Sequence, residues 1–204
     1  MKKKIQVLFI HGGMTFKSYK DYINYLKNRP VRLTDYVSWS GDYLDKKLGS
    51  NFEIIRPKMP LKENSKYEEW KINFERYLPY LKNKFILIGS SLGGIFLAKY
   101  LSENKLPKKA LLVCMVCPPF DNTCSDEDLA GGFRLKKDLS KIYDNAKSIH
   151  LMFSHDDECV PVCHADKYKN KLPKANIYIY NDKKGHFKVS EFPEIIKIIK
   201  NIVE

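Results

Sequence analysis

The 204-residue sequence predicts a single-domain α/β fold, with a mostly parallel β-sheet and helices on both of its faces. Two observations lead to this prediction. Short apolar runs alternate with segments at helical spacing along the whole chain, an order typical of parallel strands joined by helices. The run over residues 85–88 is apolar at every position, as expected of a strand that is buried on both faces of such a sheet.

The first predicted elements are a strand and two helices. The strand covers residues 5–10, and a helix covers residues 17–28. A second helix is expected over residues 34–49, with Thr34 as its N-cap and Gly49 as its C-terminal stop.

A strand over residues 52–56 and an amphipathic helix over residues 65–83 come next. Ser65 is the expected N-cap of this helix. One stripe of the helix is aromatic and is expected to face the core: Tyr67, Trp70, Phe74 and Tyr77. Alternation then continues, with strands over 85–89, 110–116, 149–154 and 176–180 and helices over 92–103, 138–147, 163–171 and 193–203.

Polar and glycine-rich segments follow four of the predicted strands. They read HGGMTF from residue 11, GSSLG from residue 89, SHDDECVP from residue 154 and NDKKGHF from residue 181. Because active sites of open parallel sheets collect at the carboxyl ends of the strands, these four segments are expected to lie together.

The segment Gly89-x-Ser91-x-Gly93, between a buried strand and a helix, resembles the nucleophile elbow of the α/β-hydrolase superfamily. Ser91, an aspartate and His186 occur in the chain order that this superfamily uses. The HGG segment resembles its oxyanion loop, and Asp157-x-x-Val-Pro resembles its acid loop. The compact length is most similar to the small, nearly lidless, carboxylesterase-like branch. The resemblance implies an α/β-hydrolase fold.

The resemblance also implies a role for each residue. Ser91 would be the nucleophile, and Gly89 and Gly93 would give the strained turn the room that it needs. His186 would accept the serine proton, and Asp157 would fix its tautomer.

Several assignments stay open at this point. Ser90 is a second candidate nucleophile, and Asp156 and Asp121 are rival candidates for the acid. His11 is interpreted as a structural hydrogen-bonding residue of the oxyanion loop rather than a second base.

The oxyanion hole is expected to use backbone N–H groups. One comes from Leu92, directly after the nucleophile. The other comes from Gly13 or Met14, between which the sequence does not decide.

The implied activity is hydrolysis of a small carboxylic ester through an acyl-enzyme, with no cofactor and no metal. A thioesterase or peptidase would use the same triad, and a non-catalytic binding module could use the same fold. Residues 118–140 are a candidate partial lid. Phe120, Phe133 and Phe187 line a small apolar pocket in one interpretation and are ordinary core or surface residues in the other.

Composition limits the other classes. The net charge of +12 comes from scattered lysines, and arginine is scarce, so a nucleic-acid partner is not expected. No apolar run is long enough for a membrane span, and no export signal is recognisable, which favours a cytoplasmic location. Five cysteines make a disulfide framework improbable, and Cys114-x-x-Cys117 lies in a strand-like run unsuited to a zinc knuckle. The oligomeric state is left open.

Overall fold

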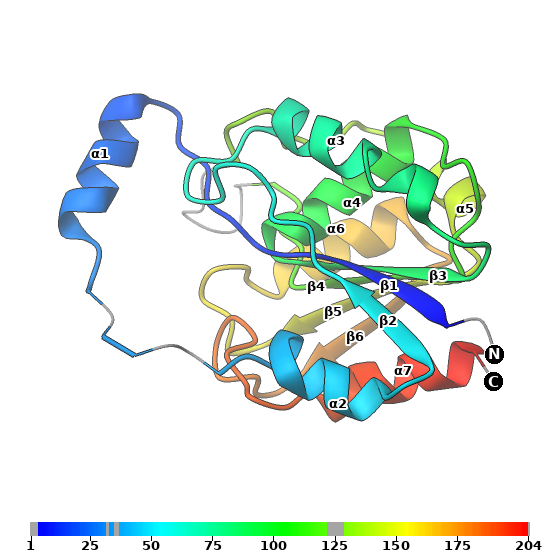
Figure 1. The fold of residues 1–204 in the computed structure, drawn as a ribbon. Helices are drawn as coiled ribbons and strands as arrows, with labels where there is room; N and C mark the ends of the chain where they lie inside the picture. The colour runs from blue at the N-terminus through cyan, green and yellow to red at the C-terminus, as the bar shows by residue number, and fades with distance from the viewer. Residues whose placement is uncertain (1–3, 32, 35–36, 122–128, 204) are drawn as a thin grey trace.

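The computed structural model describes residues 4–31, 33–34, 37–121 and 129–203 (Figure 1). Within these residues, six strands form one sheet with the order β2-β1-β3-β4-β5-β6, and every neighbouring pair is parallel. The predicted α/β class is therefore confirmed. The strands are β1 (Ile5–Ile10), β2 (Phe52–Ile55), β3 (Phe85–Ser90), β4 (Leu112–Val116), β5 (Ile149–Ser154) and β6 (Asn176–Tyr180).

Helices cover both faces of the sheet. In Figure 1, α3, α4, α5 and α6 lie above it, whereas α2 and α7 lie below it. The helices are α1 (Tyr19–Asn28), α2 (Leu44–Leu48), α3 (Tyr67–Glu75), α4 (Leu92–Glu103), α5 (Ile142–Asn145), α6 (Cys163–Lys171) and α7 (Pro193–Val203). Among the described residues, no helix has the length and apolar character that a bilayer crossing requires.

The strand β3 and the helix α4 contain few polar residues because both lie in the hydrophobic core. Residues 85–89 of β3 are all buried, and α4 packs directly on β3 and β4. The Phe96 ring of α4 meets Trp70 and Phe74 of α3 at centroid distances of 5.8 and 5.3 Å. This aromatic layer fixes α4, and therefore its N-terminus, against the sheet.

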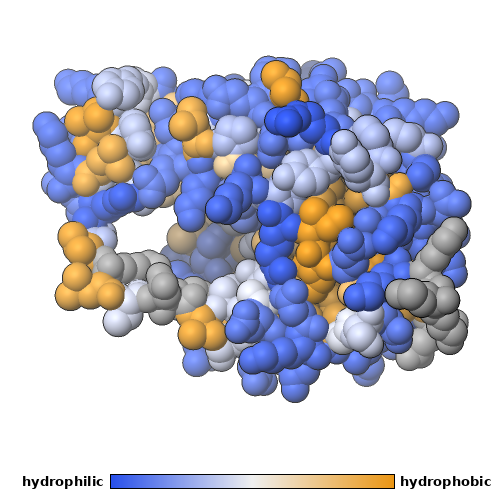
Figure 2. All heavy atoms as spheres, viewed as in Figure 1, coloured by the Kyte–Doolittle hydropathy of each residue, from blue (hydrophilic) through white to orange (hydrophobic). Residues whose placement is uncertain are grey.

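The helix α1 is the exception to this packing. None of its residues is buried, and Figure 2 shows an opening below it, to the left of the body of the molecule. Its first turn is capped by Ser18, whose side chain accepts a hydrogen bond from the Asp21 amide.

The second predicted helix begins later than expected. Thr34 lies in a bend, and the N-cap is Ser38, whose hydroxyl accepts a hydrogen bond from the Ser40 amide. A π-helical turn (Trp39–Tyr43), kinked at Gly41, then leads into α2. The Trp39 ring is held edge-on against Phe9 and Phe192, so tertiary packing rather than the Thr34 signal sets the start. Gly49 ends α2 with φ of 77°, as predicted.

The prediction that Ser65 is the N-cap of the next helix is wrong. The Ser65 hydroxyl donates to the carbonyls of Leu61 and Lys62 instead, and Lys66 occupies the N-cap position without a side-chain bond. The helix α3 ends at Glu75, and a short 3₁₀ turn (Leu78–Tyr80) follows it. The elements β4 and α5 are shorter than the predicted ranges.

Candidate active site

Ser91 lies at the turn between β3 and α4 with φ of 53°, a left-handed conformation that is costly for a non-glycine residue. Only glycine fits two residues before and two residues after Ser91. A Cβ on Gly89 would lie 2.3 Å from the Gly93 carbonyl oxygen, and a Cβ on Gly93 would lie 2.3 Å from the Ile10 oxygen. The Ser91 amide donates to the Val116 carbonyl at 2.8 Å, which ties the turn to β4. The sequence Gly-Ser-Ser-Leu-Gly therefore forms a sharp turn that positions Ser91 at the carboxyl edge of the sheet.

The loop after β1 lies directly against this turn. A Cβ on Gly12 would lie 3.2 Å from the Ser91 Cβ, and a Cβ on Gly13 would lie 3.1 Å from Leu92 Cδ2. His11 holds the loop, because its Nε2 accepts a hydrogen bond from the Met59 amide while its Nδ1 contacts the Gly12 carbonyl. This geometry agrees with a structural role for His11.

The candidate oxyanion-hole amides differ in their hydrogen bonds. The Met14 amide donates to the Lys62 carbonyl at 2.8 Å, so this N–H is already occupied. Within the described part of the chain, the amides of Gly13 and Leu92 donate to no other residue. Of the two predicted alternatives, Gly13 is therefore the one that this structure leaves available.

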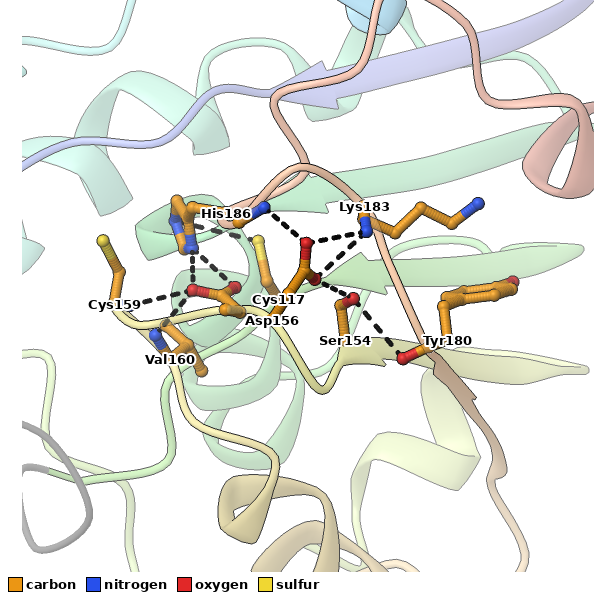
Figure 3. Close-up of polar contacts among 10 residues, drawn as sticks. Cys117, Ser154, Asp156, Cys159, Val160, Tyr180, Lys183 and His186 are labelled. Atoms are coloured by element: carbon orange, nitrogen blue, oxygen red, sulfur yellow. Dashed lines mark hydrogen bonds and ion pairs between the residues drawn. The ribbon is translucent and has the colours of Figure 1, made fainter.

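His186 and Asp157 are in direct contact. The His186 Nδ1 lies 2.8 Å from Asp157 Oδ2 and 3.0 Å from Oδ1. Asp157 is itself buried, and its Oδ1 accepts hydrogen bonds of 2.9 Å from the amides of Cys159 and Val160. Figure 3 shows these contacts converging below the His186 ring. A carboxylate accepts only, so His186 donates through Nδ1, and the lone pair of the unprotonated ring is on Nε2.

Asp156, the rival candidate, has a different set of partners. Its carboxylate accepts hydrogen bonds from the amides of Lys183 and Gly185, at 2.7–3.1 Å, and from the Ser154 hydroxyl (Figure 3). Burial alone would raise the pKa of Asp156, but these donors lower it well below its usual range. Asp156 thus holds the backbone of the loop that carries His186, whereas Asp157 holds its ring.

Cys117 is the neighbour that the sequence did not predict. This fully buried residue follows β4 with φ of 43°, and its Sγ lies 3.8 Å from His186 Nε2. Among the described residues, no hydrogen bond joins His186 to Ser91, so the ring faces the thiol in this state. The signal was available, because Cys117 is the first residue beyond a strand whose end faces the same edge.

The charges of this group are coupled. Burial alone would lower the pKa of His186, but its contacts with Cys117 and Asp157 raise it well above the ordinary value. Burial raises the pKa of the Cys117 thiol, which favours its protonated form.

The remaining candidates lie apart from these contacts. Ser90 is the last residue of β3. Asp121 forms an ion pair with Lys167 of α6. Phe133 is fully buried against Tyr67 and Trp70, and Phe187 is packed on Phe192, so both belong to the core. Phe120 is half-buried, with its ring edge-on to Tyr168.

The candidate lid over residues 118–140 lies partly outside the described residues. Within residues 129–140, Leu129, Phe133 and Leu139 are buried, and the Gly131 carbonyl accepts a hydrogen bond from the Tyr67 amide at the start of α3.

Comparison with known proteins finds no matching family model and no matching curated protein. Solved structures do match over nearly the whole chain. The ydeN gene product of Bacillus subtilis has a TM-score of 0.71 at 18% identity, covering 98% of this chain and 99% of that one.

The chain has the α/β-hydrolase fold. Two other structures support this. A lipase-esterase related protein from Clostridium acetobutylicum gives a TM-score of 0.59 at 13% identity, with 98% and 95% coverage. The esterase Pf2001 of Pyrococcus furiosus gives 0.57 at 16% identity, with 98% and 82% coverage.

Proposed function

We propose that this protein is a serine hydrolase that cleaves small carboxylic esters through an acyl-enzyme on Ser91. The observation that carries the proposal is the meeting of four segments at one sheet edge. The Ser91 turn abuts the glycine loop after β1, and the His186–Asp157 pair lies at the ends of β5 and β6. The esterase names among the structural neighbours favour ester bonds over other acyl substrates.

In the proposed first step, the Ser91 hydroxyl attacks the ester carbonyl while His186 Nε2 takes its proton. The imidazole turns from Cys117 toward Ser91 when substrate binds, because catalytic hydrogen bonds often align only in the complex. Asp157 keeps the proton on Nδ1 and stabilises the imidazolium that forms. The amides of Leu92 and Gly13 would donate to the developing oxyanion.

In the second step, His186 passes its proton to the leaving alkoxide, and the alcohol departs. A water molecule then gives a proton to His186 as it attacks the acyl-Ser91 carbonyl. Collapse of the second tetrahedral intermediate returns that proton to Ser91 and releases the carboxylic acid. Asp156 contributes indirectly in this proposal, by fixing the loop from which His186 projects.

Labelling with a fluorophosphonate serine probe tests the proposal. We expect one adduct, mapped by mass spectrometry to Ser91, that is lost in Ser91→Ala and His186→Ala and kept in Ser90→Ala. An unlabelled, folded protein would contradict the proposal. A panel of esters, thioesters and amides then separates the esterase from the thioesterase and peptidase alternatives.

A further inference from the structure

Three metal-ligating side chains gather beside Ser91. Cys117, Asp157 and His186 each offer a ligand atom, and these atoms lie within 4.8 Å of one another. The proposed acyl-transfer steps use His186 and Asp157 but give Cys117 no chemical task. Figure 3 shows Cys117 directed at the His186 ring from the end of β4.

We propose that Cys117 and His186 form an inhibitory binding site for a thiophilic divalent cation, of which Zn²⁺ is the main candidate. The inhibition rests on the proposed function, because a cation on His186 would block the base that activates Ser91. The binding itself depends only on the positions of the two side chains.

The separation of the two ligand atoms suits one cation. Zn–S and Zn–N bonds are about 2.3 Å and 2.0–2.1 Å long. A single Zn²⁺ therefore bridges Sγ and Nε2 at their distance of 3.8 Å, with a bond angle only slightly wider than tetrahedral. The strained backbone of Cys117, with φ of 43°, holds the sulfur in this position.

Asp157 supplies the partner that a metal-binding histidine usually has. Histidine ligands commonly donate their second ring N–H to a carboxylate, which fixes the tautomer and makes the ligating nitrogen more basic. The contact between His186 Nδ1 and Asp157 is of this kind, and it leaves the Nε2 lone pair facing Cys117. Asp157 thus belongs to the outer shell of the proposed site.

Binding requires no oxidant or reductant. The thiol and the Nε2–H of the protonated imidazole lose their protons to solvent, the sulfur and Nε2 each donate a lone pair to Zn²⁺, and water fills the remaining positions. The His186 side chain is 19% exposed, which gives the cation a way in from solvent. A thiolate–imidazole pair favours Zn²⁺, Cd²⁺ and Co²⁺ over Mg²⁺ and Ca²⁺, which prefer oxygen ligands.

Co²⁺ is the probe for the test, because a cobalt–thiolate bond gives a charge-transfer absorption that does not depend on activity. Chelator-treated protein is titrated with Co²⁺, and Zn²⁺ is then used to displace it. We expect one Co²⁺ per chain with a thiolate band, no band in Cys117→Ala, and about 10–100-fold weaker binding in Asp157→Asn. Circular dichroism confirms that each variant is folded.

Two thiols serve as controls. Cys114→Ala removes a buried thiol from β4, the strand that Cys117 follows, and Cys159→Ser removes an exposed thiol near Asp157. Both should keep the band. A folded native protein without a thiolate band, a band that persists in Cys117→Ala, or a band that is lost in Cys159→Ser would each overturn the site.

Protection of Ser91 from the fluorophosphonate probe measures the inhibition. Zn²⁺ should slow labelling of the native protein at least tenfold more than labelling of Cys117→Ala, and Mg²⁺ should leave the rate unchanged. Equal slowing of both would overturn the inhibitory role. Labelling without a cobalt band makes only the cation site wrong, and a cobalt band without labelling makes only the hydrolase proposal wrong.

Discussion

The Nδ1 of His186 lies 2.8 Å from Oδ2 of Asp157, a contact that joins the loops after β6 and β5 across 29 residues of sequence. The carboxylate is fixed in turn by two backbone amides, so it has little freedom to leave the ring. The Nδ1 edge of the imidazole is therefore anchored on Asp157 before any substrate is present, and the proposed turn of the ring toward Ser91 keeps this contact.

Asp157→Asn is expected to lower kcat for a good ester substrate by on the order of 10³–10⁴, because the amide no longer fixes the tautomer or stabilises the imidazolium. Steady-state kinetics on the purified variant measure this. Asp121→Asn is the control, since Asp121 pairs with Lys167 instead. A loss of less than tenfold in Asp157→Asn would remove Asp157 from the proposed triad.

The pH profile of kcat/KM should rise with pH. His186 acts as a base only when it is unprotonated, and its pKa is raised above the ordinary value of about 6.5. Activity should therefore be lost as pH falls through an inflection that lies above 6.5, and Asp157→Asn should move that inflection downward. An inflection below 6.5 in the native enzyme would contradict the raised pKa.

Asp156→Asn should weaken activity through the His186 loop. One acceptor oxygen is lost, which leaves a partly buried amide of the loop without its charged partner, at a cost of about 1–3 kcal/mol in unfolding free energy. Asp138→Asn is the control, because Asp138 is an exposed aspartate that accepts hydrogen bonds from the Ser140 amide and hydroxyl and not from the His186 loop. Denaturant unfolding and kcat/KM are measured on both. If the two variants behave alike, Asp156 does not position the loop.

Gly89→Ala should damage both stability and labelling of Ser91. The added Cβ would meet the Gly93 carbonyl at 2.3 Å, and relieving this clash costs about 1–3 kcal/mol and moves the turn. Ser91→Ala should lose labelling while keeping the native melting temperature within a few degrees. A fully stable and fully labelled Gly89→Ala protein would contradict the close packing of the turn.

His150 should make stability depend on pH below neutrality. Burial lowers its pKa to about 4, and its ring is hydrogen-bonded to Ser148 and Tyr178. Because the unfolded chain binds the proton more tightly, the stability is present above about pH 6.5 and is lost as pH falls toward 4, by up to about 3 kcal/mol. His150→Gln should flatten the dependence of unfolding free energy over this range, as measured by urea unfolding at several pH values. A slope equal to that of the native protein would assign the effect to other groups.

The sequence by itself determined the class of fold, the parallel strands and the bounds of several elements. The strands β1, β5 and β6 and the helices α4, α6 and α7 have the predicted bounds. These segments have strong local patterns, either a continuous apolar run or a clear helical period. It also indicated which strand ends would meet, because parallel strands place their carboxyl ends at one edge.

Only the tertiary structure decided where local signals compete with packing. Thr34 and Ser65 have the chemistry of N-caps, yet burial of Trp39 moved one helix start and backbone carbonyls of a neighbouring turn took up the Ser65 hydroxyl. Phe133 is part of the aromatic core because its ring packs on Tyr67 and Trp70 of α3.

The tertiary structure also decided which residues of the candidate site contact one another. Asp156 and Asp157 are neighbours in the sequence, but their carboxylates reach different atoms. Asp156 accepts a hydrogen bond from the backbone of the His186 loop, whereas Asp157 contacts the His186 ring. The contact between Cys117 and His186 spans 69 residues and depends on the order of β4, β5 and β6 across the sheet. Local sequence specifies residue types and periods. Distances between side chains on different strands are set by the register of the sheet and the conformations of its loops, which no single segment encodes.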